Sequence, residues 1–165
     1  MYVQVKQFVK MLHTLSRLLD KAQRHAGENK SDSAVLLNSR LSPDMLPLTS
    51  QVQMACDTAR LATSVLSGKK PPVFEGMEKT IPELKALIQK SIDYITSLKE
   101  CDFSGWEERI VAPDGWAGAF KGEDYFYQHA VPNFYFHMVT AYAILRHKGV
   151  HIGKMDYIGQ LPFLR

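Results

Sequence analysis

The chain of 165 residues has only two cysteines, Cys56 and Cys101, and they fall in different predicted segments. Small disulfide-stabilised scaffolds need more cysteines than this, so we expect both to be reduced thiols and the protein to be cytoplasmic. The stretch 1–12 is interrupted by Gln4, Lys6 and Lys10, which argues against a secretory signal segment.

The sequence also lacks a strong excess of charge and any long hydrophobic run. The formal net charge is +3, and the basic residues are scattered along the chain rather than clustered. Proteins that bind nucleic acids usually show a basic patch, and a membrane-spanning helix needs roughly 20 apolar residues in succession. The sequence therefore predicts neither nucleic acid nor a membrane as a partner.

Common catalytic motifs are missing too. There is no G-x-S-x-G, no glycine-rich phosphate loop, no C-x-x-C and no H-E-x-x-H in the chain. The E-x-x-H pairs of di-iron helical bundles are also absent. Most enzymes built on helical bundles would show one of these motifs, so no nucleophile–base pair is apparent from the sequence.

The sequence does contain four long amphipathic segments, in which apolar residues recur every three or four positions. They predict helices over residues 2–25, 48–66, 80–98 and 124–147. The second ends before Gly68, and the third begins with a capping box formed by Thr80 and Glu83. A short helix is expected over 31–38, and the tail after Gly149 is long enough to fold back over the other helices.

Residues 107–112 and 117–121 predict a short hairpin that turns at Pro113–Asp114–Gly115. The fold class is therefore an all-α four-helix bundle, in one domain over residues 1–165, with a small β-hairpin before the last long helix. The loop between the first two long helices is too long for a simple turn, so we expect it to carry the chain along the bundle as a crossover.

The last long segment holds the candidate site. His129, Asn133 and His137 recur every four residues, which places them along one face of a helix. Pro132 lies beside them and predicts a kink that could open a pocket. On the second long helix Gln51 falls within the apolar arc and is the expected facing partner, with Gln53 as the alternative if that helix is rotated.

Two hypotheses follow from this polar row. In the first, His137 binds a divalent metal such as zinc or nickel, with His129 or an amide completing the site. In the second, Gln51, Asn133 and His137 form a pocket that has no metal, and this pocket binds a small molecule or only fixes the packing. Aromatic residues on the last helix exceed what one core face requires, which predicts a homodimer surface.

Two segments carry a resemblance to a known family: LSPDMLPLTSQVQMACDTAR at 41–60 and HAVPNFYFHMVTAYAILRHKGVHIGKMDYIG at 129–159. The chain resembles the DinB/YfiT-like superfamily of four-helix bundles and, within it, an uncharacterised domain-of-unknown-function family. Metal-binding relatives use one histidine of the second long helix and a histidine pair on the fourth. By position those ligands correspond to Gln51 or Gln53, and to Asn133 and His137.

The resemblance implies dimers, and its characterised members include metal-dependent transferases that act on low-molecular-weight thiols. Here two of the three ligand positions hold amides. We therefore favour a homodimeric bundle without a metal cofactor, whose interior polar pocket binds a small molecule or has a structural role. The alternative is a divalent-metal-dependent enzyme, either thiol transferase-like or a hydrolase, with a degenerate metal site.

Overall fold

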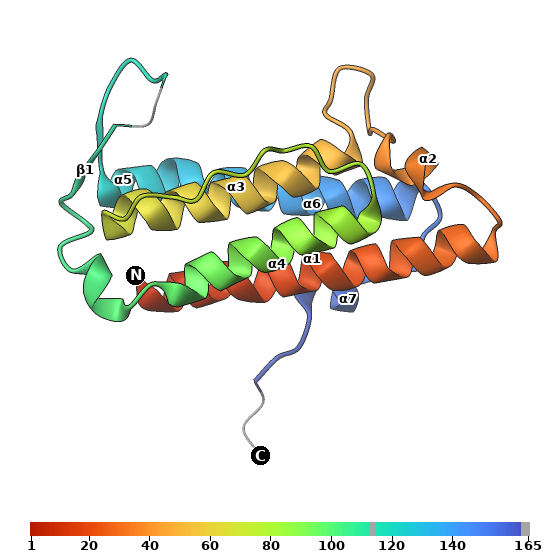
Figure 1. The fold of residues 1–165 in the computed structure, drawn as a ribbon, viewed down its shortest axis with the longest axis horizontal. Coiled ribbons are helices and arrows are strands. Elements are labelled where there is room, and N and C mark those ends of the chain that lie inside the picture. Colours follow the sequence, from red (N-terminus) through yellow and green to blue (C-terminus); the bar gives the residue numbers. More distant parts are fainter. Residues whose placement is uncertain (113–114, 163–165) are drawn as a thin grey trace.

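The computed structural model describes residues 1–112 and 115–162, and its main feature is a set of long helices packed side by side (Figure 1). The four longest are α1 (Tyr2–Glu28), α3 (Leu48–Ser67), α4 (Ile81–Ser97) and α6 (Val131–His147). The all-α bundle with a small hairpin, expected from the apolar periodicity, is confirmed. No helix among the described residues is long and apolar enough to cross a membrane.

Local sequence signals set the helix ends. Thr80 accepts a hydrogen bond from Glu83 N, and the Glu83 carboxylate accepts one from Thr80 N, which completes the predicted capping box of α4. Gly68 ends α3 in the left-handed conformation, with φ of 71°. The short helix α2 (Ser33–Leu37) begins at Asp32, whose carboxylate accepts a hydrogen bond from Ala34 N.

The crossover of the bundle lies between α3 and α4, not between α1 and α3 as the loop length suggested. Residues 68–80 run back along α3, because Arg60 donates a hydrogen bond to Pro72 O (2.6 Å) and Gln53 donates one to Gly76 O (3.0 Å). Lys69 and Asp102, beyond the carboxyl ends of α3 and α4, are 3.1 Å apart. These two helices are therefore parallel, whereas α1 and α3 run in opposite directions (Figure 1).

A short hairpin precedes the last long helix, as predicted. Its strands β1 (Ile110–Val111) and β2 (Phe120–Lys121) pair antiparallel, with Ile110 opposite Lys121. They are shorter than expected, and Pro113 and Asp114 of the predicted turn lie outside the described residues. The 3₁₀ helix η1 (Glu100–Phe103) leads from α4 toward this hairpin.

The helix predicted over 124–147 is instead built of three consecutive pieces. These are α5 (Gly122–Tyr125), the π-helical turn η2 (Phe126–Ala130) and α6. Pro132 accounts for the interruption, because it has no N–H to donate to the preceding turn and its ring clashes with the carbonyl there. A π-helical turn absorbs this mismatch with one extra residue.

The tail folds back onto α1, as its length suggested. Its helix α7 (Lys154–Ile158) is held to α1 by an ion pair between Lys21 and Asp156, 2.7 Å apart. Tyr157 packs edge-on against Tyr142 of α6, with ring centroids 5.6 Å apart. The tail therefore bridges α1 and α6 on the outside of the bundle.

Candidate functional site

Gln51 and His137 meet between α3 and α6. The Gln51 Oε1 and His137 Nδ1 atoms are 2.8 Å apart, and the two residues are only 1% and 8% exposed. Gln51 Nε2 donates a second hydrogen bond, to Leu46 O at 3.0 Å, which fixes the orientation of the amide. Oε1 is therefore an acceptor, so the proton of a neutral His137 ring resides on Nδ1 and Nε2 keeps its lone pair.

The surroundings favour the neutral form of this ring. Burial lowers the pKa of the His137 imidazole below the ordinary histidine value of 6.5. At neutral pH the ring is therefore uncharged, with a donor directed at Gln51 and an acceptor at Nε2.

Asn133, one turn before His137, bonds to α3 through a residue that the sequence did not single out. Asn133 Nδ2 donates to Thr58 Oγ1 (2.8 Å), and the Thr58 hydroxyl in turn donates to Met54 O (2.7 Å). Within the described residues, neither Asn133 Oδ1 nor His137 Nε2 makes a hydrogen bond. Thr58 lies seven residues after Gln51, a spacing that puts both on one face of α3 and could have indicated its role.

The other two candidate residues lie elsewhere. Gln53 Nε2 donates to Gly76 O (3.0 Å) and Glu78 Oε2 (2.8 Å), so it holds the crossover segment rather than facing His137. His129 packs against Trp116 and Tyr125, with ring centroids 4.7 and 5.5 Å away. Of the two glutamines, the structure brings only Gln51 to the polar row.

His129 and His137 are not placed to share one metal ion. They are eight residues apart, which corresponds to about 12 Å along a helix axis, whereas a zinc–nitrogen bond is about 2 Å long. Among the described residues, no three His, Cys, Asp or Glu side chains gather in a way that could hold a metal. His137 Nε2 and Asn133 Oδ1 alone do not fit the three-ligand site that the superfamily implies.

Neither cysteine is placed as a reactive nucleophile beside the Gln51–His137 pair. Cys56 is buried in α3, and burial raises the pKa of its thiol to about 12, so the thiol stays protonated. Cys101 is exposed on η1, beyond the end of α4, and both cysteines are free.

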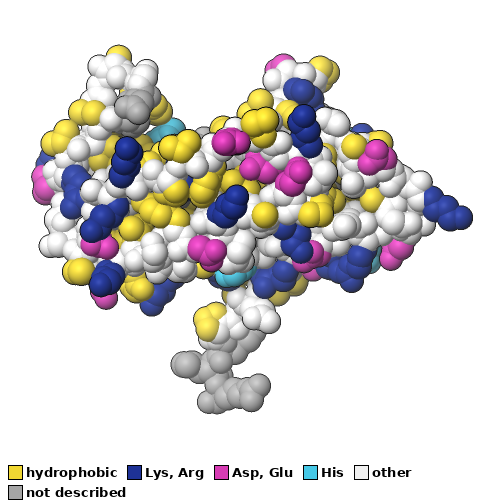
Figure 2. Space-filling model, viewed as in Figure 1, with side chains coloured by type: hydrophobic (Ala, Val, Ile, Leu, Met, Phe, Trp, Pro, Cys, Tyr) yellow, Lys and Arg dark blue, Asp and Glu magenta, His cyan; other side chains and the backbone are white. Residues whose placement is uncertain are grey.

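The polar row lies between two projecting segments. The hairpin and the loop over residues 38–47 both rise above the long helices (Figure 1), and Figure 2 shows the surface hollowed between them. Leu46 O of the loop meets Gln51, and Trp116 of the hairpin meets His129. We call this hollow the saddle. Gln51 and His137 lie toward the loop, His129 lies toward the hairpin, and the Asn133–Thr58 pair lies between them along α6 and α3.

Comparisons with known proteins agree with this fold. Long helices with a parallel crossover pair form an all-α bundle of the DinB type. The chain is similar to a solved structure described as the crystal structure of a DinB family member protein from Shewanella denitrificans. The two are 40% identical, with a TM-score of 0.94, and the match covers 98% of this chain and 92% of that chain.

A family model identifies the particular family. The model described as a domain of unknown function (DUF1993) matches residues 1–158. The chain therefore belongs to this family, as its two quoted segments predicted. A search of curated proteins finds no match.

Proposed function

We propose that the saddle binds a small, uncharged molecule that has an apolar body and a hydrogen-bond donor, without a metal cofactor. The observation that carries this proposal is the fixed orientation of Gln51, which leaves His137 Nε2 as an acceptor. Asn133 Oδ1, one turn away, is a second acceptor of the same kind. An alcohol, phenol or primary amide could donate to either atom.

The lack of charge along α6 supports a neutral ligand. Between Asp124 and Arg146 the chain has no Asp, Glu, Lys or Arg. The walls of the saddle present apolar side chains, with Trp116 47% and Leu46 45% exposed. Ligand sites of this type combine a mostly apolar lining with a few polar groups that fix orientation.

The alternative, a divalent-metal-dependent enzyme of the thiol transferase or hydrolase type, has less support. In this structure Gln51 is the partner of His137 Nδ1, so it is turned away from any ion at Nε2. A catalytic zinc site needs three protein ligands and an open position. Among the described residues that bond around His137, its ring alone offers a nitrogen lone pair, because the amide nitrogens of Gln51 and Asn133 are donors.

Matched ligand pairs test this proposal. We expect benzyl alcohol and cyclohexanol to shift the ¹⁵N resonance of His137 Nε2 and the Asn133 amide signals, with toluene and cyclohexane shifting them much less. The variant His137→Gln keeps a partner for Gln51 but should weaken alcohol binding several-fold. Equal shifts from both members of each pair would contradict the proposal, and so would stoichiometric zinc or nickel binding that is lost in this variant.

We further propose that the protein is a homodimer joined through the outer face of α6. Pro132, Phe136, Val139 and Ala143 follow a spacing of four, three and four residues, which is the pattern of a helix-pairing seam. Phe136 is 55% and Val139 50% exposed, so about half of each of these side chains is left uncovered by the described chain. An uncharged stripe can pair with its own copy about a two-fold axis.

A charge placed in the stripe should separate the subunits. We expect Phe136→Glu to be monomeric, because pairing would bury two carboxylates against apolar surface. Val73→Glu, at an 86% exposed position of the crossover, is the control that should leave the oligomeric state unchanged. Sedimentation velocity would measure both, and a monomeric wild-type protein at micromolar concentration would refute the dimer.

A further inference from the structure

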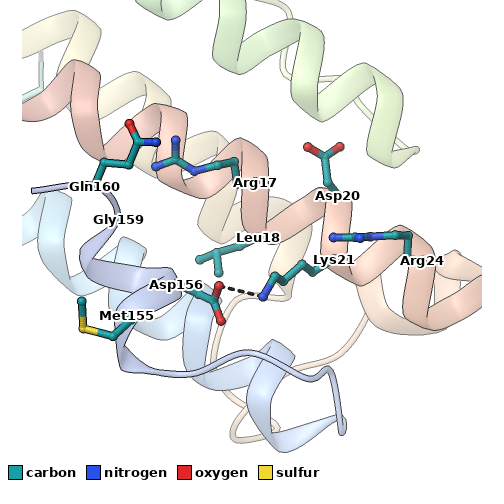
Figure 3. Close-up of a pocket in the computed structure, with 9 residues that line it drawn as sticks. All are labelled: Arg17, Leu18, Asp20, Lys21, Arg24, Met155, Asp156, Gly159 and Gln160. Atoms are coloured by element: carbon teal, nitrogen blue, oxygen red, sulfur yellow. Dashed lines mark hydrogen bonds and ion pairs between the residues drawn. The ribbon is translucent and has the colours of Figure 1, made fainter.

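A second hollow, separate from the saddle, lies between α1 and the tail (Figure 3). It has a volume of about 450 Å³, within the range of small-molecule sites. We call it the tail groove, and its main lining residues are Arg17, Leu18, Lys21, Arg24, Met155 and Gln160. We propose that the tail groove is a binding site for a small amphipathic carboxylate.

The charges in the tail groove leave two guanidinium groups available. Asp156 is paired with Lys21 at 2.7 Å, and Asp20 is paired with Lys85 of α4, so both carboxylates already have a partner. Within the described part of the chain, Arg17 and Arg24 have no acidic partner. A guanidinium binds a carboxylate through two parallel hydrogen bonds, so these residues favour an anionic ligand.

The carboxylate of the ligand is expected at the end of the groove where Arg17 lies. Arg17 and Gln160 lie together at one end, and Arg24 lies at the other, with the Lys21–Asp156 pair between them (Figure 3). Arg17 Nη2 donates to Thr14 Oγ1 at 3.0 Å, which restrains the guanidinium. The amide N–H₂ of Gln160 can add a further donor beside Arg17.

The tail forms one wall of the groove, and its backbone approaches α1 most closely at Gly159. Gly159 has φ of 72°, and a Cβ built there would lie 2.8 Å from Thr14 Oγ1 and 2.9 Å from Arg17 Nη2. The backbone of the tail therefore passes directly beside Arg17, at a distance that only glycine permits. The end of the groove at Arg17 is preformed, which lowers the cost of ordering it when a ligand binds.

The apolar lining explains why an inorganic anion alone is not the expected ligand. Leu18 is 1% exposed and closes the floor, while Met155 is 64% exposed and forms a flexible wall. The methylene stems of Lys21 and Arg24 add further apolar surface. A carboxylate with a short aliphatic or aromatic body would satisfy both the guanidinium and this lining.

Calorimetry and the ε-methyl NMR signal of Met155 test the site with hexanoate, 1-hexanol and inorganic phosphate. We expect hexanoate to bind and to shift the Met155 signal, and to bind about ten-fold more weakly to Arg17→Gln. The control Lys70→Gln removes an exposed cation on the crossover and should bind like the wild type. Both substituted side chains are exposed, so both variants should fold.

Three results would overturn the proposal: equal binding of 1-hexanol and hexanoate, equal binding of phosphate and hexanoate, or unchanged hexanoate affinity in Arg17→Gln. The tail groove shares no residue with the saddle. Hexanoate binding there is therefore judged independently of the His137 and Asn133 signals that report on the saddle.

Discussion

Replacing Gly122 by alanine is expected to lower the free energy of unfolding by about 3 kcal/mol or more. Gly122 begins α5 and is buried where the hairpin meets the bundle. A Cβ at this position would lie 1.9 Å from Trp106 O and 3.0 Å from Leu66 Cδ2. The first neighbour is a backbone carbonyl, so relief requires the segment before the hairpin to shift away from α5.

Urea denaturation followed by circular dichroism would measure this loss. The matched control is Gly118→Ala in the same hairpin, where a Cβ meets nothing within 4 Å. We expect the control to change the free energy of unfolding by less than about 0.5 kcal/mol. If Gly122→Ala were as stable as the control, the close packing of α5 on residues 106–107 would be wrong.

Removing one member of the Gln51–His137 pair should cost more than removing both. His137→Leu leaves Gln51 Oε1 buried without a donor, and an unsatisfied buried polar group costs about 1–3 kcal/mol. Gln51→Leu leaves the His137 Nδ1 proton without an acceptor, with a similar penalty. In the double variant both polar groups are gone and two leucines fill similar space.

A double-mutant cycle separates this effect from general loss of packing. We expect the two single losses to sum to at least about 1 kcal/mol more than the loss of the double variant. Simple additivity would show that the 2.8 Å contact contributes nothing to the stability of the α3–α6 seam. A matched cycle on Gln53 and Glu78, which meet outside this seam, should show a smaller coupling because that pair is only partly buried.

Much of the fold could be predicted because it depends on local interactions. The capping box at Thr80 and the left-handed Gly68 involve residues within one turn of each other, so the sequence indicates them directly. The crossover was wrongly placed for the opposite reason. The connection between α1 and α3 and the connection between α3 and α4 are both long. Which of them runs along the bundle depends on side chains from other parts of the chain, such as Arg60, which binds Pro72 O.

Helix periodicity indicated some residues of the candidate site but not all of the contacts between them. A spacing of four predicted Asn133 and His137 on one face of α6, and the apolar arc of α3 favoured Gln51 over Gln53; in the structure Gln51 bonds to His137 and Gln53 to Gly76. Thr58 was missed: its spacing of seven residues from Gln51 places it on the same face of α3, but spacing does not show that Asn133 of α6 bonds to it. His129 shares the same period, yet its ring packs against Trp116 of the hairpin.

The sequence by itself determined the helices, the family and the helix face that carries the polar row, because all three depend on the order and spacing of residues along the chain. Tertiary structure alone decided which polar groups meet. Gln51 binds both Leu46 O and His137 Nδ1, and this fixes which nitrogen of the ring remains an acceptor. A tautomer depends on atoms brought together from different helices and loops, and residue spacing does not encode that proximity.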